Sequence, residues 1–549
     1  MPTALGKIQI CPSLQVQYLD YASWQREWMK GETLKTFIDH WKEILSGELP
    51  TLDLPTDHPR PVRPTYRGQR HFFTFSTVTS SQIKEFCRKE RITSFQFFLA
   101  AYAILLKCYS GLEDIITGCP FANRPLPELD GAIGMFVNTL PIRLNLSGNP
   151  SVRALLEQVR KVMLDAFTWQ AAPFESLVSE ISPERDISRN PIFQVMINMR
   201  NVPVRPTSTN GLEVERVLGE GETAAFDISL ELGEEGNHFM GALRYNTSLF
   251  DQLTIMRMAS HYQNILFGML SKPEFPISKL EILPPSERQQ LVVDWNSTWE
   301  EFPQECLHSL ITMQAAKNPE SIAVICNGRQ LTYSALEHKA NKLSSYILAK
   351  GIRSGELVGI FLPRSEELQV CQLAVLKSGA AYLPLDLTYP VERLTYMLED
   401  ANPAMVITQS DLVAQLPGKY QKVYLDTETS AIQFCPDQGF AVQSDGDTTI
   451  YVTYTSGSTG RPKGVLTLQR GVMNYLHFLI KSFQLKPADR VIQITPLSFD
   501  AACRDTLGVL AFGGTILLMN DEQMRDPDFI SASIQQQGAT CMLSVVPTM

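Results

Sequence analysis

A short stretch near residue 455 gathers the residue types that bind phosphate groups. Two glycines, one lysine and four hydroxyl side chains lie within nine residues: Thr455, Ser456, Gly457, Ser458, Thr459, Gly460 and Lys463. A polyphosphate is held by many short donors close together, and glycine lets the backbone approach it with unusual torsions. Lysine adds a compact positive charge for the phosphate oxygens. The stretch therefore predicts a polyphosphate-binding loop.

The residues before this loop predict the strand that would position it. Residues 448–454 are all β-branched or aromatic, which is typical of a core strand. The order Lys463-Gly464 and the glycine spacing differ from those of a Walker A loop, so a P-loop NTPase is excluded. A flexible serine–glycine linker is disfavoured because the stretch is short and follows a strong strand signal.

Apolar strands and helices alternate in the second half of the chain. Helical patterns at 333–348 and 368–377 alternate with apolar strand patterns at 357–362 and 404–408. Such alternation favours a parallel sheet covered on both faces, whose ligands bind at the carboxyl ends of strands. We therefore expect the loop at one of these ends.

The first half mixes helix and strand patterns. Helices are predicted from periodicity, with serine N-caps such as Ser80 and glycine stops, at 16–29, 34–45, 80–91, 94–109, 152–169 and 251–270. Strands are predicted at 70–75 and 114–118, and a further pair at 225–232 and 238–245 follows the turn signal Asn210-Gly211. A polar, proline-punctuated segment then predicts a domain boundary near residue 290.

Composition and charge exclude several classes of protein. The chain has 549 residues, 44% hydrophobic and 19% charged, so disorder and fibrous structure do not fit, and length alone favours three or four domains. A net charge of −10 argues against a nucleic-acid or anionic-membrane partner. The 10 cysteines form no CxxC pair, the 8 histidines show no metal-ligand spacing, and the longest apolar run, residues 97–106, suits a buried helix. We therefore expect a cytoplasmic protein without a metal site or a membrane span.

Several motifs are similar to those of nonribosomal peptide synthetases. Residues 454–465 resemble the phosphate-loop signature of the amino acid adenylation domains of these enzymes, and further matches lie at 331–336, 376–386 and 498–500. The first half resembles the second lobe of a condensation domain, on the motifs at 18–26, 133–139, 173–175 and 185–191, and residues 283–290 look like the usual junction. The resemblance covers essentially the whole chain.

This resemblance implies a fold class and a domain plan. The expected fold is α/β: a chloramphenicol-acetyltransferase-like condensation lobe, then an adenylate-forming large subdomain with stacked mixed and parallel sheets and flanking helices. The expected segments are the C-terminal part of a condensation domain (1–285), a linker (286–305) and the N-terminal part of an AMP-binding adenylation domain (306–549). The count of domains thus falls to two.

The implied activity is ATP-dependent formation of an aminoacyl adenylate. The loop 455–463 would hold the outgoing phosphates with Mg²⁺, and the aminoacyl group would pass to a phosphopantetheine thiol on a carrier domain outside this chain. A condensation domain would then form the peptide bond. The partners expected are therefore an amino acid and carrier domains of the same synthetase, and secondary metabolite biosynthesis, such as that of a toxin, is the expected role.

Two parts that the family needs are absent from the sequence. No histidine has a histidine neighbour, so the His-His-x-x-x-Asp-Gly motif of condensation domains is missing and no catalytic residue is assigned there. The family's adenine-binding segment and catalytic lysine would follow Met549. We therefore expect an internal fragment that is inactive in isolation. One local departure is Leu468-Gln469-Arg470, where the family usually has a histidine after the loop.

The resemblance also implies a substrate pocket. In the family, the aspartate matched by Asp500 pairs with the substrate's α-ammonium, and the residues matched by Ala501 and Arg504 line the side-chain pocket. A largely desolvated guanidinium needs an anionic or strongly accepting partner. We therefore expect an acidic, aspartate-like substrate bound by Arg504 in a bidentate pair, an arrangement reminiscent of cyanobacterial microcystin-type synthetases.

Other interpretations remain open at this point. Asp500 could be a helix N-cap and Arg504, four residues later, could pair with it. Asn138 and Arg189 of the first half would more often cap a loop or pair with a nearby aspartate than do chemistry. For the whole chain, the alternatives are an acyl-CoA-synthetase-like ligase with an unrelated N-terminal domain, or a non-catalytic docking fragment.

Overall fold

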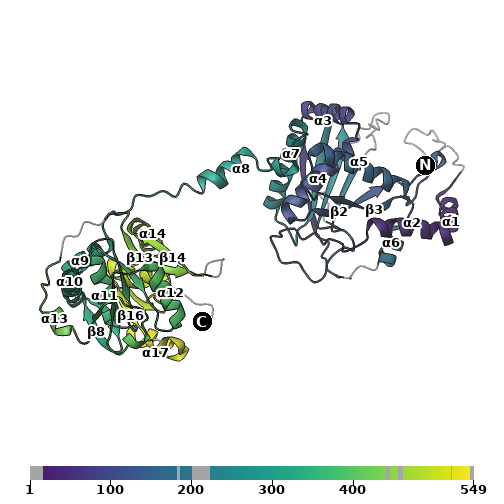
Figure 1. Cartoon of the computed structure of the whole chain (residues 1–549). Coiled ribbons are helices and arrows are strands. Elements are labelled where there is room, and N and C mark those ends of the chain that lie inside the picture. The colour runs from purple at the N-terminus through teal and green to yellow at the C-terminus, as the bar shows by residue number, and fades with distance from the viewer. Residues whose placement is uncertain are drawn as a thin grey trace. The chain divides into compact units, whose positions relative to one another are not determined.

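The computed structural model describes residues 16–181, 186–200, 223–439, 445–455, 461–520 and 522–543. The chain divides into two compact units, Met1–Thr298 and Trp299–Met549 (Figure 1). The expected turn at Asn210-Gly211 lies outside the described residues.

The first unit is built on one mixed six-stranded sheet in the order β1-β6-β5-β4-β2-β3. The strand β4 runs parallel to both β2 and β5, and the other neighbours are antiparallel. The strands are β1 (Gly68–Thr74), β2 (Asp114–Phe121), β3 (Asn138–Asn145), β4 (Val195–Arg200), β5 (Ile228–Glu235) and β6 (His238–Asn246). The helices are α1 (Tyr18–Trp28), α2 (Gly31–Ile44), α3 (Thr77–Glu90), α4 (Ser94–Ser110), α5 (Val152–Thr168), α6 (Phe174–Ile181), α7 (Gln252–Ser271) and α8 (Pro285–Gln289).

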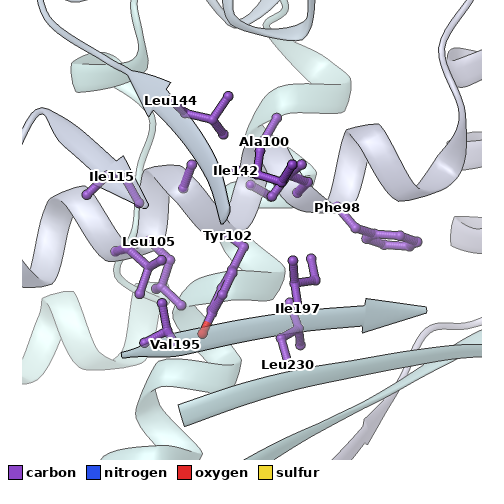
Figure 2. Close-up of a cluster of buried hydrophobic side chains, with 14 of the residues drawn as sticks. Phe98, Ala100, Tyr102, Leu105, Ile115, Ile142, Leu144, Val195, Ile197 and Leu230 are labelled. Carbon is purple, nitrogen blue, oxygen red and sulfur yellow. The ribbon is translucent and has the colours of Figure 1, made fainter. Parts of the chain in front are cut away.

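Helix α4 lies at the centre of this unit's core. A capping box of Thr93 and Gln96 begins it, and Gly111, with φ of +74°, ends it. Every residue from Gln96 to Leu106 is buried, because the helix is apolar on nearly all sides. The core around it is shown in Figure 2 and includes Phe98, Tyr102, Leu105, Ile142, Leu144, Val195 and Ile197.

The expected N-cap of α3 was wrong. The helix begins after Ser76, whose hydroxyl accepts a hydrogen bond from the Thr79 amide at 3.0 Å. Ser80 lies inside the helix and is buried, and its hydroxyl accepts the Phe239 amide of β6 at 2.9 Å. A serine signal at residue 80 therefore marked a contact between helix and sheet rather than a helix start.

The second unit contains two sheets, in the orders β12-β11-β9-β10-β13-β14 and β15-β16-β7-β8. All pairs are parallel except β13 with β14 and β7 with β8. Their strands are β7 (Ile322–Cys326), β8 (Arg329–Thr332), β9 (Leu357–Ile360), β10 (Ala381–Pro384), β11 (Met405–Thr408), β12 (Gln421–Tyr424), β13 (Thr449–Thr455), β14 (Lys463–Leu468), β15 (Arg490–Gln493) and β16 (Thr515–Leu518).

Helices flank these sheets and supply many of the buried residues of the unit's core. They are α9 (Leu307–Lys317), α10 (Tyr333–Ala349), α11 (Glu366–Lys377), α12 (Val391–Ala401), α13 (Thr429–Gln433), α14 (Gln469–Phe483), α15 (Ala501–Cys503), α16 (Val509–Ala511) and α17 (Pro527–Gln537). Among the described residues no single helix is long and apolar enough to cross a membrane, and only α3 with α4, bent by 100° between them, would pass by length and composition.

Candidate functional site

The candidate phosphate loop connects the two antiparallel strands β13 and β14. Thr455 is the last residue of β13 and Lys463 the first of β14, and the two are register partners. Both are exposed. Ser456, Gly457, Ser458, Thr459 and Gly460 lie outside the described residues. The sequence interpretation placed Lys463 in the loop, whereas the structure places it at the start of a strand.

Helix α12 forms hydrogen bonds with the chain on both sides of the loop, at the end of β13 and just before β14. The buried Tyr454 hydroxyl donates to the Asp400 carboxylate at 2.6 Å, and the Tyr396 hydroxyl donates to the Pro462 carbonyl at 3.0 Å. Burial and the bond to Asp400 raise the pKa of Tyr454, so its proton stays in place. A Cβ atom on Gly464 would lie 3.1 Å from the Tyr454 ring, so glycine suits this close approach. Hydrogen bonds to α12 thus fix the backbone that carries the Lys463 side chain.

The three candidate substrate residues lie on a helical segment interrupted by a π turn. Asp500 is exposed and its side chain accepts the Ala501 amide at 2.7 Å at the start of α15. Arg504 begins the π turn Arg504–Gly508, and its side chain is 13% exposed. Asp500 therefore does cap α15, as one of the open alternatives held.

A carboxylate that the sequence interpretation missed contacts Arg504. Arg504 Nε lies 2.7 Å from Oδ1 of the fully buried Asp505, and Arg504 Nη1 donates to the Tyr475 hydroxyl of α14 at 3.1 Å. Burial alone would lower the pKa of Arg504, but the bond and charge of Asp505 raise it. The guanidinium is therefore charged and held on two sides. The one signal in the sequence was that Asp505 directly follows Arg504.

Tyr451 of β13 lies near Asp500 and also near Tyr475, which is the hydrogen-bond partner of Arg504. Burial raises the pKa of the Tyr451 hydroxyl, and the nearby Cys503, Asp500 and Tyr475 raise it further. The Tyr451 ring also packs against Tyr382 of β10, with 5.6 Å between ring centroids. Asp500 and Tyr475, the partner of Arg504, thus both lie close enough to the Tyr451 hydroxyl to raise its pKa.

Polar motif residues of the first unit have structural partners. The Asn138 amide donates to the carbonyls of Gln170 and Ala172 at 2.8 and 2.6 Å. Arg189 lies 2.8 Å from a carboxylate oxygen of Asp53 and 3.5 Å from one of Asp186. These contacts agree with the structural interpretation of both residues, and we assign neither a catalytic role.

Sequence comparison finds two families along the chain. The condensation domain family matches residues 3–292, and the AMP-binding enzyme family matches residues 311–549. One component of the linear gramicidin synthase of Brevibacillus parabrevis is 38% identical over 99% of this chain, and tyrocidine synthase 3 of the same organism is 36% identical over 97%. The chain spans only 7% and 8% of the length of these two relatives.

Structure comparison gives the same order of domains. A four-domain nonribosomal peptide synthetase, solved with AMP and glycine bound to it, superposes with a TM-score of 0.85 at 25% identity. The match covers 96% of this chain and 40% of that protein.

The chain belongs to the nonribosomal peptide synthetases, as a condensation domain followed by an AMP-binding domain. The expected family and the mixed α/β fold class are confirmed. The alternative of a ligase with an unrelated N-terminal domain was wrong, because that half is a condensation domain. The narrower likeness to microcystin-type synthetases has no support from these relatives.

Proposed function

We propose that the second unit joins an amino acid carboxylate to the α-phosphate of ATP and releases pyrophosphate. The aminoacyl adenylate then loads a phosphopantetheine thiol of a carrier domain, and the condensation unit takes part in forming the peptide bond. The observation that supports this most is the exposed Lys463, opposite Thr455 at the end of a hairpin anchored on α12. An ammonium beside a hydroxyl-rich loop suits the charge of the departing phosphates.

Magnesium is expected to enter with the phosphates of ATP. Among the described residues no group of three or more histidine, cysteine, aspartate or glutamate side chains could hold a metal ion, so we assign Mg²⁺ no protein ligands.

The nine cysteines in the described part of the chain are free thiols, which supports the expected cytoplasmic location.

The amino acid that we propose is acidic, with aspartate as the leading candidate. The exposed Asp500 carboxylate would pair with the α-ammonium, and Arg504 would pair with the side-chain carboxylate. An acidic substrate would share the guanidinium with Asp505, which contacts Nε, and with Tyr475, which contacts Nη1.

Amino-acid-dependent ATP–pyrophosphate exchange tests both parts of this proposal. The assay is run across the common amino acids on the 549-residue chain and on a synthetase module that contains it. We expect exchange in the module to be strongest with aspartate or glutamate and to be lost in Lys463→Ala. Exchange with leucine or phenylalanine, and none with the two acids, would contradict the acidic substrate. Exchange that is unchanged in Lys463→Ala would contradict the role of the loop.

A further inference from the structure

The pair of Arg504 and Asp505 has an unusual local geometry. Consecutive residues do not face each other on a regular α-helix, yet these two side chains meet at 2.7 Å. The helix is interrupted here by the π turn Arg504–Gly508, between α15 and α16. π turns are rare in proteins, and those that occur are often found at functional sites.

A buried polar network fixes the position of the Asp505 carboxylate. Its second oxygen, Oδ2, accepts the Thr495 hydroxyl at 2.6 Å, and Asp505 is fully buried. The Thr495 carbonyl in turn accepts hydrogen bonds from Gln493 Nε2 and from the Arg364 guanidinium. Arg364 also donates to Gln493 Oε1 at 2.7 Å. These bonds leave the carboxylate little freedom, since moving it would leave buried donors unpaired.

We propose that Asp505 is a positioning residue that sets substrate selectivity through Arg504. It holds Nε of the guanidinium, while Tyr475 holds Nη1, so that the orientation of Arg504 is fixed. Its charge also offsets that of Arg504. This inference rests on the proposed function, because it needs Arg504 to meet the substrate.

Two substitutions separate the two effects of Asp505. Asp505→Asn keeps an oxygen for Arg504 Nε and an amide that can donate to the Thr495 hydroxyl, so the orientation persists while the negative charge is lost. A substrate carboxylate then no longer competes with a second carboxylate for one guanidinium. Asp505→Ala removes the same charge and also both hydrogen bonds, so the guanidinium is free to turn away, and this loss of orientation outweighs the loss of charge. The two variants should therefore change selectivity in opposite directions.

The experiment measures selectivity as a ratio of affinities. Aspartate and asparagine are each titrated by calorimetry into the 549-residue chain saturated with α,β-methylene-ATP. We expect the aspartate-to-asparagine preference to rise about fivefold in Asp505→Asn and to fall at least about tenfold in Asp505→Ala. The matched control is Thr506→Val, which removes a buried hydroxyl that donates to the Ala502 carbonyl at 2.7 Å without touching Arg504. This control should leave the ratio unchanged.

The possible failures are distinguishable. A wild-type chain that does not prefer aspartate, or one whose preference survives Arg504→Gln, overturns the acidic-substrate proposal and this inference with it. A preference that depends on Arg504 but is unchanged in both Asp505 variants overturns this inference alone. The same holds if both Asp505 variants only lower stability, which is the effect expected of the Thr506→Val control, because that outcome is what a purely structural role of Asp505 predicts.

Discussion

His308 of α9 lies in a partly buried position beside the Lys377 ammonium. Lys377 itself is 2.5 Å from a carboxylate oxygen of Glu337 and 2.9 Å from the Thr312 hydroxyl. Burial, together with the charge of Lys377, lowers the pKa of His308 to about 4, against an opposing effect of Glu337. The imidazole is therefore neutral in the folded second unit, whereas it binds a proton below pH 6.5 when unfolded.

This shift predicts that the second unit loses stability as the pH falls from about 6.5 towards 4. At pH 5 the unfolded chain gains about 2 kcal/mol from protonating His308, which the folded unit does not share. Urea unfolding at pH 7 and pH 5 measures the loss. We expect His308→Gln to lose about 2 kcal/mol less than the wild type between these pH values. Equal losses in both proteins would contradict a lowered pKa of His308.

Tyr102 carries a buried hydroxyl with no hydrogen-bond partner among the described residues (Figure 2). An unpaired buried hydroxyl costs free energy, so Tyr102→Phe should raise the free energy of unfolding of the first unit by about 1 kcal/mol. Tyr262 is the matched control, since its equally buried hydroxyl donates to the Phe98 carbonyl at 3.1 Å. Tyr262→Phe should lower the same quantity by about 1 kcal/mol. Urea unfolding that shifts in the same direction for both variants would refute this interpretation.

At the scale of elements, we expect α12 to increase the affinity for ATP through its hydrogen bonds to the β13–β14 hairpin. Tyr454→Phe removes the bond to Asp400, and the loosened hairpin should weaken ATP binding about threefold to tenfold, as measured by calorimetry. The control is Tyr346→Phe, which removes a tyrosine bond to Glu428 elsewhere in the same unit. It should cost similar stability and leave ATP affinity unchanged. Equal effects on ATP would argue that α12 has no special role.

Some of these elements could be predicted from the sequence and others could not. The strand β13 was predictable because seven β-branched or aromatic residues precede the loop. The strand β14 was not, since it begins with Lys463-Gly464 and exists only through pairing with β13. The true N-cap of α3 was hidden among several serines. Local patterns thus identify strands with strong propensity but not strands that depend on a partner.

The candidate site divides in the same way. The residue types of the loop and the positions of Asp500 and Arg504 were visible as a motif, because their spacing in the chain carries the signal. Asp505 was missed, since its importance comes from complete burial and from Thr495, ten residues away in sequence. Burial of a charged group is a property of tertiary packing, which one sequence does not display.

At the scale of the whole molecule, each unit has a hydrophobic core of its own. Ile142 belongs to the core of the first unit, and Leu373 to that of the second, and both are fully buried. We expect two unfolding transitions in calorimetric scans. Ile142→Ala and Leu373→Ala should each destabilise one unit by about 2 to 5 kcal/mol and leave the other transition in place. A single transition lowered by either variant would contradict two independent cores.

The most direct test of the central claim is equilibrium binding of ATP to the 549-residue chain, measured by calorimetry. We predict one ATP site per chain, weakened at least about tenfold in Lys463→Ala. Lys419→Ala, which removes another exposed lysine of the same unit, should bind ATP as the wild type does. Wild-type affinity in Lys463→Ala would contradict the assignment of the β13–β14 loop as the phosphate site.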